Sequence, residues 1–155
     1  MADLERFVQA QHKQYPKALK EIQQGQKKTH WMWYIFPQIK GLGYSDIAKY
    51  YEIQSIAEAE AYMKHKQLGC RLTICCNELM LLPTDDAVEV FGEIDAQKLK
   101  SCMTLFDEVS GLPVFKRVLD KFFKGKRCQK TMKTLIRMRT EATKHERPNF
   151  YQRES

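Results

Sequence analysis

The sequence predicts an all-α, mainly helical fold in a single compact multi-helix domain. Apolar residues recur every three or four positions through most of the chain. Ser and Asp stand where helices are expected to begin, and no segment alternates as a strand does. A length of 155 residues favours one domain and allows a packed core. We therefore place a helical domain at residues 1–138 and a polar, mobile C-terminal tail at residues 139–155.

The first helices are predicted from their capping residues. Asp3 suits the N-cap of a first helix, and Pro16 suits the first turn of a second helix that ends at Gly25. Ser45 suits the N-cap of a helix that follows a glycine-containing segment. Ser55 opens the sequence Ser-Ile-Ala-Glu, which is the capping-box pattern at the start of a further helix.

The second half of the chain predicts helices with an apolar stripe. Pro83 is expected to stop a helix over residues 68–82, and Thr84 suits the N-cap of a short acidic helix ending near Gly92. The helices expected after these cover residues 95–111, 112–125 and 129–138. In each of them the apolar residues fall at helical spacing, which indicates one face turned toward a core.

Positive charge is concentrated late in the chain. Residues 116–139 contain ten Lys or Arg and one acidic residue, so this segment carries +9 and the rest of the chain −2. It is either a solvated helical surface or a patch that contacts nucleic acid or an acidic protein partner. The cations expected to form such a patch are Lys116, Arg117, Lys121, Lys124, Lys126 and Arg127.

Cysteine usage and hydropathy point to the cytoplasm, with access to the nucleus left open. The five cysteines are an odd number without a C-x-x-C pair, so we expect free buried thiols, no metal site and no cofactor. No window of 18 uninterrupted apolar residues is present, and the N-terminus is charged and amphipathic. We therefore expect a soluble protein without membrane contact.

The densest apolar stretch, THWMWYIFPQIKGLG at residues 29–43, has two interpretations. It is either a central core element followed by a turn, or the wall of a pocket for a planar ligand. His30 and Gln38 flank the aromatic residues, as polar groups flank an aromatic pocket. Gly41 and Gly43 permit positive φ or close approach of the backbone to a ligand.

Other polar residues are candidates to complete such a pocket. Arg71 is suited to bind an anion through two parallel hydrogen bonds, and Lys98 lies off the apolar stripe of its helix. The complete candidate set for ligand binding is Trp31, Trp33, Gln38, Gly41, Gly43, Ser45, Tyr51, Arg71, Lys98, Ser101 and Thr104. The candidates for a catalytic group are His30, Asp46 and Glu52. Each also has a purely structural explanation as a cap, a core residue or a solvated surface residue.

These stretches together resemble a known family. The residues HWMWYIFPQIKGLGYSDIAKYYEI, SIAEAEAYMKHKQLGCRL, DAQKLKSCMTLF and PVFKRVLDKFFKG are similar, in order and spacing, to the DUF1810 family (domain of unknown function 1810). The similarity covers roughly residues 3–137. It implies a mainly helical fold and does not by itself imply an activity.

A more distant resemblance suggests a reaction. The order of an aromatic segment, a Ser-led helix, the LGCR turn and the DKFF helix is similar to that of NADAR-type proteins, which are helical N-glycosidases. That resemblance implies a nucleotide-like or ribose-linked small-molecule ligand and a hydrolase activity. Those enzymes place a glutamate on the Ser-led helix, where this chain has Asp46 and Glu52 at shifted positions. The alternative function is a non-enzymatic binding protein that uses residues 116–139.

Overall fold

Nine helices form the part of the chain that the structure describes. The computed structural model describes the backbone of residues 3–154 and the side chains of residues 3–144. The helices are α1 (Glu5–Gln23), α2 (Met32–Ile35), α3 (Asp46–Tyr51), α4 (Ile56–Lys64), α5 (Lys66–Leu81), α6 (Ala87–Phe91), α7 (Glu93–Ser110), α8 (Pro113–Phe123) and α9 (Gln129–Glu154). Extended pairing within residues 3–154 is limited to one parallel bridge between Ile39 and Ile53, so the expected all-α fold is confirmed.

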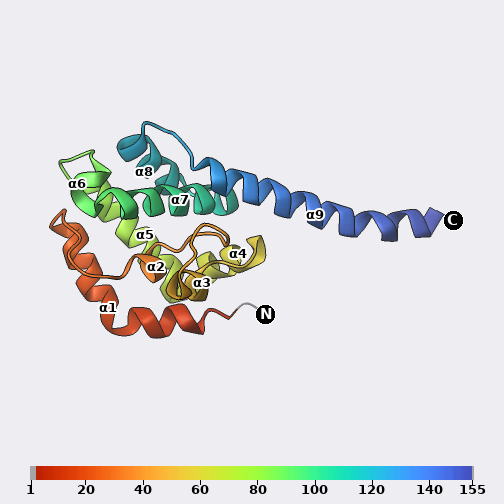
Figure 1. Ribbon diagram of the computed structural model, residues 1–155, viewed down its shortest axis with the longest axis horizontal. Helices are drawn as coiled ribbons and strands as arrows, with labels where there is room; N and C mark the ends of the chain where they lie inside the picture. Colours follow the sequence, from red (N-terminus) through yellow and green to blue (C-terminus); the bar gives the residue numbers. More distant parts are fainter. Residues whose placement is uncertain (1–2, 155) are drawn as a thin grey trace.

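Two helices, α5 and α7, form the centre of the domain (Figure 1). Helices α1, α4 and α8 pack against α5, and α4, α6, α8 and α9 pack against α7. The side chains between them are apolar and fully buried, among them Leu72, Leu99 and Phe106. Burial of one such side chain contributes roughly 1.5–3 kcal/mol, so the buried side chains of α5 and α7 together account for much of the stability of the domain.

The caps at Ser45 and Ser55 are confirmed. The Ser45 hydroxyl accepts a hydrogen bond from the Ala48 N–H at 3.2 Å, and the Ser55 hydroxyl accepts one from the Glu58 N–H at 3.1 Å. The Glu58 carboxylate reaches back one residue further than in a standard capping box, because it accepts from the Gln54 N–H. These bonds satisfy backbone donors that a helix start leaves free.

Three expected boundaries near the ends of helices are wrong. Leu4, not Asp3, precedes the first helix, and α1 continues through Pro16 instead of ending there. Figure 1 shows that α1 bends, as a helix does where proline removes one hydrogen bond. Asp86, not Thr84, caps α6, while the Thr84 hydroxyl accepts from the Asp86 N–H.

Helix α9 is longer than the sequence suggests. It was expected to end near residue 138, but it continues through Glu154 and projects away from the domain (Figure 1). Apolar spacing is weak in this segment, so amphipathic periodicity gives no signal for the continuation. That residues 139–155 form a mobile tail stays a prediction.

Candidate ligand-binding cleft

The aromatic segment divides into a buried part and a partly exposed part. Trp31, Met32 and Phe36 are completely buried, as the core interpretation predicts. The Trp31 indole Nε1 donates a hydrogen bond of 3.0 Å to Glu21 Oε1 on α1. Since the N–H of this tryptophan already has a partner within the protein, Trp31 is a core residue with no face free for a ligand.

Glu21 holds the chain between α1 and α2 through several donors. Its carboxylate accepts from the N–H groups of Lys28 and Thr29, from the Thr29 hydroxyl and from Trp31. Burial on its own raises the pKa of Glu21, but these hydrogen bonds outweigh it and lower the pKa from 4.5 to about 2. The carboxylate is therefore ionised at neutral pH and serves the fold.

Trp33 lies on the surface side of the aromatic segment, with a cation over its ring. The Lys98 ammonium is 4.4 Å from the ring centroid and 3.2 Å from Asp95 Oδ1. Asp95 also binds Lys27 at 2.8 Å. Lys98 thus contacts an aromatic ring and a carboxylate of its own chain. Neither Lys98 nor Trp33 lines the cleft between the glycine-containing loop and α9.

A cleft lies between the glycine-containing loop and α9, and its volume is about 1170 Å³. One wall consists of the loop after Ile39, the end of α3 and the start of α4. The other wall is the side of α9 between Thr134 and Thr143. Its lining residues are Lys40, Gly41, Gly43, Tyr44, Lys49, Glu52, Gln54, Ser55, Ile56, Ala57, Thr134, Arg137, Met138, Arg139, Glu141, Ala142 and Thr143.

The loop wall has a fixed backbone shape. The Ile39–Ile53 bridge closes the loop, since the Lys40 N–H donates to the Ile53 carbonyl at 2.9 Å. Gly41 has φ of +95° and its N–H donates to Glu52 Oε2 at 3.2 Å. A Cβ at Gly43 would lie 2.5 Å from the Ala48 Cβ, so Gly43 lets α3 pack closely on the loop.

The cleft offers one freely exposed aromatic ring and an excess of positive charge. Tyr44, which follows Gly43 in the loop, is 84% exposed. Four cations line the walls, two from the loop side (Lys40 and Lys49) and two from α9 (Arg137 and Arg139). The acidic lining residues are Glu52 and Glu141. This combination suits an anionic molecule with a planar group.

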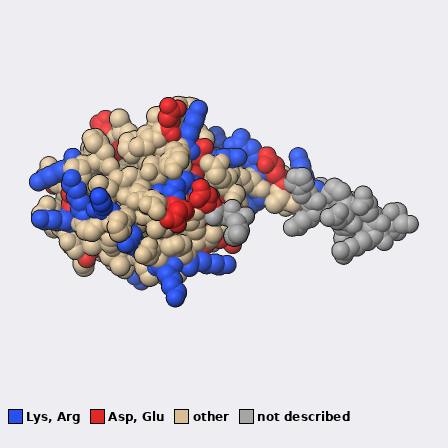
Figure 2. Space-filling model, turned by 90° about the horizontal axis from the view of Figure 1, so that it is seen from below, with Lys and Arg blue, Asp and Glu red and all other residues tan. Residues whose placement is uncertain are grey.

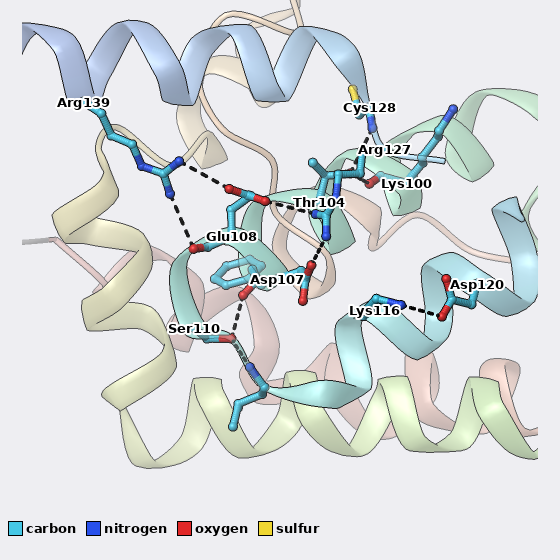
Figure 3. A network of polar contacts seen from close by, with 12 residues as sticks. Lys100, Thr104, Asp107, Glu108, Ser110, Lys116, Asp120, Arg127, Cys128 and Arg139 are labelled. Atoms are coloured by element: carbon cyan, nitrogen blue, oxygen red, sulfur yellow. Dashed lines mark hydrogen bonds and ion pairs between the residues drawn. The ribbon is translucent and has the colours of Figure 1, made fainter. Parts of the chain in front are cut away.

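An ion-pair network fixes the base of α9, as Figure 3 shows. Glu108 on α7 lies 3.3 Å from both Arg127 Nη1, before α9, and Arg139 Nη1, within α9. Arg127 also pairs with Asp107. Arg127 precedes the first turn of α9 and Arg139 lies about three turns further along the helix. Because Glu108 pairs with both arginines, the direction of α9 depends on its attachment to α7.

Two predicted ligand residues belong to this same attachment. The Ser101 hydroxyl lies 2.7 Å from the Thr131 hydroxyl, and the Thr104 hydroxyl accepts from the Cys128 N–H at 3.0 Å. Ser101 and Thr104 are buried and face α9, so neither side chain is open to a ligand. Both hydroxyls therefore have protein partners away from the cleft.

The structure brings only part of the predicted site together. Gly41, Gly43 and Glu52 line the cleft, whereas the other candidates do not. The Gln38 backbone carbonyl accepts a hydrogen bond from the Ile53 N–H, and the Arg71 guanidinium lies 4.7 Å from the centroid of the Tyr15 ring. Away from the cleft lie Trp31, Trp33, Gln38, Ser45, Tyr51, Arg71, Lys98, Ser101, Thr104 and the catalytic candidates His30 and Asp46.

Sequence reasoning missed the cleft residues Lys40, Tyr44, Lys49 and Arg137. A usable signal is present for the first three, since basic and aromatic residues alternate around the two glycines. No such signal exists for Arg137: it lies inside the helix expected over residues 129–138, but its position opposite the loop depends on how α9 is placed on the domain, which no local pattern encodes. The two walls of the cleft come from segments that are almost one hundred residues apart in the sequence.

The cations of the basic segment have different environments. Lys121 donates to the Leu82 carbonyl at 2.6 Å, and Lys116 pairs with Asp120 at 3.2 Å. Arg127 is held by α7 as described above. The remaining predicted patch members, Arg117, Lys124 and Lys126, are exposed or near the surface. Figure 2 shows Lys and Arg at the base of the projecting helix and also at the opposite end of the domain.

The cysteines of the described region are free thiols. Cys75, Cys76 and Cys102 are buried, and burial raises the pKa of all three, that of Cys75 to about 12. They are therefore protonated and unreactive at neutral pH. Residues 3–144 contain no group of three or more His, Cys, Asp or Glu side chains placed to hold a metal ion.

Among the described residues, no helix combines the length and the apolar character needed to cross a membrane.

Comparisons with known proteins place the chain in a family. The model for "Protein of unknown function (DUF1810)" matches residues 1–135. The crystal structure of the conserved hypothetical protein Rv1873 from Mycobacterium tuberculosis is similar, with 39% sequence identity and a TM-score of 0.85. The match covers 86% of this chain and 96% of that one. No curated protein matches the chain. With a family match over nearly the whole domain, the chain belongs to the DUF1810 family.

Proposed function

We propose that the cleft between the glycine-containing loop and α9 binds a nucleotide-like, ribose-linked small molecule that carries phosphate. The observation that supports this proposal is the pairing of an exposed aromatic ring with cations from two separate walls. The Tyr44 ring provides a stacking surface for a base, while Lys40, Lys49 and Arg137 surround the same space. The volume of about 1170 Å³ accommodates a molecule of this size.

The loop backbone suits close approach of a ligand. Nothing lies within 4 Å of the position that a Cβ at Gly41 would occupy, so the backbone there is open toward the cleft. A phosphate placed in the cleft would gain charge-assisted hydrogen bonds from the lysines and from the Arg137 guanidinium. Those bonds are roughly twice as strong as neutral ones.

Glu52 supports a hydrolase within the same proposal. It is the one carboxylate of the loop wall that lines the cleft, and the Gly41 N–H orients it. In N-glycosidic hydrolysis a water oxygen bonds to the ribose C1′ while the C1′–N bond breaks. Glu52 would accept the water proton and return it to solvent, and the base would leave with the electrons of the broken bond and take up one proton from solvent. This role matches the N-glycosidase resemblance better than Asp46, which lies outside the cleft.

The buried free thiols agree with a reducing compartment, which supports our proposal of a cytoplasmic location, with access to the nucleus left open.

A thermal-shift screen with AMP, ADP-ribose and NAD tests the proposal. A ligand at 100 times its Kd stabilises the folded state by about 2.7 kcal/mol, which raises the Tm of a protein of this size by roughly 5–10 °C. Tyr44→Ala and Arg137→Gln should reduce that shift without lowering the Tm of the free protein, since both side chains are exposed.

The matched control is Tyr50→Ala, which removes an exposed tyrosine of α3 that does not line the cleft. An equal effect of Tyr44→Ala and Tyr50→Ala, or no shift with any of the three ligands, would overturn the binding site. For the chemistry, Glu52→Gln should retain the thermal shift and abolish release of the base, measured by chromatography. Base release by Glu52→Gln at the wild-type rate would remove Glu52 from the proposal.

A further inference from the structure

Helix α9 carries a stripe of cations on the side opposite its contact with α7. Lys130, Lys133 and Arg137 are exposed, whereas Thr131 and Leu135 are completely buried. The three cations are three and four residues apart, so they share one helix face. With a rise of 1.5 Å per residue, they extend over about 10 Å of the helix axis. We call these three residues the α9 stripe.

Among the described residues, the stripe cations have no acidic partner, although Arg137 donates a hydrogen bond of 3.4 Å to the Thr134 hydroxyl. Of the ten Lys and Arg in residues 116–139, Lys116, Arg127 and Arg139 pair with acids and Lys121 binds carbonyl oxygens. Within the described residues the other six, which include the whole α9 stripe, have no acidic partner. Their charges are therefore free to meet an external anion.

Arg137 connects the stripe to the cleft. It is the third member of the stripe and also lines the cleft wall that faces Tyr44 and the glycine-containing loop. A single nucleotide with its phosphate at Arg137 would leave Lys130 about 10 Å away along the helix and without a ligand. A strand with one phosphate for each nucleotide would reach both ends of the stripe.

We propose that the natural ligand of the cleft is one nucleotide of a single-stranded nucleic acid whose phosphate backbone runs along the α9 stripe. This inference rests on the proposed function and extends it from a free nucleotide to a polymer. A base must be unstacked to lie against Tyr44, which favours a single strand over a duplex. An aromatic platform beside a row of cations is the usual composition of such sites.

The composition of the stripe also favours nucleic acid over an acidic protein. Protein interfaces are centred on buried apolar residues, and their cores are depleted of charged groups. The α9 stripe is instead three exposed charges in a row, next to an exposed ring that can stack on any base. Binding should then depend on salt through the release of counterions from the phosphates.

Fluorescence anisotropy with a fluorescein-labelled 12-nucleotide single-stranded RNA tests the inference. Three phosphate contacts predict affinity that falls roughly 20-fold between 50 and 200 mM salt. The double variant Lys130→Gln/Lys133→Gln should bind roughly 25-fold more weakly at 0.1 M salt and reduce the slope of log K against log salt by about 1.4. Both side chains are exposed, so folding should be unaffected.

A matched control removes the same charge elsewhere. Lys17→Gln/Lys20→Gln changes two exposed lysines three residues apart on α1, and it should bind RNA within twofold of wild type. Equal weakening by the two double variants would show that only net charge matters and would overturn the inference. Poly-glutamate that competes as well as RNA, with the same dependence on Lys130 and Lys133, would also overturn it and indicate an acidic protein partner.

The design separates this inference from the proposed function. The stripe variant should leave the thermal shift by ADP-ribose or AMP unchanged, because Lys130 and Lys133 do not line the cleft. Mononucleotide binding with no measurable RNA binding would refute the polymer and keep the cleft. A further outcome is an RNA affinity that falls in the stripe variant but is unchanged in Tyr44→Ala. That result would show that the stripe binds nucleic acid without a base in the cleft, and it would refute the inference.

Discussion

Glu21 on α1 and Trp31 before α2 are joined by a hydrogen bond of 3.0 Å from the indole Nε1 to the carboxylate Oε1. The bond explains why the densest aromatic stretch of the chain is core at its start. It also positions the loop that follows, because Trp31 packs against Phe36 with ring centroids 6.2 Å apart. Two residues later the chain reaches Gln38 and the bridge that shapes one wall of the cleft.

Glu21→Ala should destabilise the protein by roughly 3 kcal/mol. The substitution leaves the buried Trp31 N–H and the N–H groups of Lys28 and Thr29 without an acceptor, and each unsatisfied buried group costs about 1–3 kcal/mol. Urea denaturation measures the change in the free energy of unfolding. Glu60→Ala, at an exposed position on α4, is the control and should change that free energy by less than about 0.5 kcal/mol.

The same carboxylate predicts how stability depends on pH. The folded-state pKa of Glu21 is about 2, below the ordinary value of 4.5, so its contribution is complete above pH 4.5. The contribution is lost as the pH falls from about 4.5 toward 2, where the folded state also takes up the proton. The difference in unfolding free energy between wild type and Glu21→Gln should therefore shrink across this range. A difference that is constant from pH 5 to pH 2 would show that the pKa of Glu21 is not lowered.

Glu108→Ala should loosen α9 without removing any residue of the cleft. Glu108 lies 3.3 Å from both Arg127 and Arg139, so its loss removes one ion pair from each arginine, while Arg127 keeps its pair with Asp107. We expect a loss of about 1 kcal/mol, which corresponds to roughly fivefold faster amide exchange in the first turns of α9. Hydrogen–deuterium exchange with mass spectrometry measures this rate. Glu93→Ala, at an exposed position on the same helix, should leave α9 exchange at the wild-type rate.

Gly69→Ala should destabilise the contact between α4 and α5. A Cβ at this position would lie 2.1 Å from the Met63 carbonyl oxygen, which is backbone and cannot rotate away. The cost should exceed about 2 kcal/mol, since one of the two helices must move. Thermal denaturation checks the result against Cys70→Ala, which changes the next, exposed residue of α5. A Tm of Gly69→Ala equal to that of Cys70→Ala would contradict the close approach of the two helices.

The sequence predicts the features of this fold that depend on neighbouring residues. Ser45 and Ser55 cap helices because a hydroxyl needs only the N–H three residues ahead. The predicted start of the helix near Pro113 is confirmed for a similar reason, because proline suits the first turn of a helix. Pro16 has the same local chemistry, yet packing of α1 against α5 carries the helix through it.

The candidate site was less predictable because it depends on distant residues. Ser101 and Thr104 appear free when α7 is considered alone, and only the position of α9 shows that both hydroxyls have partners. Tyr44 and Arg137 line the same cleft from opposite walls, and Glu108 attaches the base of α9 that carries Arg137, an arrangement that no local pattern encodes. Gly41 and Gly43 were predicted because glycine permits positive φ and close approach of the backbone, and Glu52 was a candidate through the resemblance to NADAR-type proteins.

The most direct test of the cleft as the ligand site is a ¹⁵N-labelled titration with ADP-ribose, followed by two-dimensional NMR. We predict saturable shifts of the Gly41 and Gly43 amide signals, together with those of Arg137 and Ala142 on the facing wall. Gly92 and Gly111, which lie outside the cleft, should stay unshifted as internal controls. Saturable shifts centred on Gly92 or Gly111, or no saturable shift at Gly41 and Gly43, would contradict the proposed site.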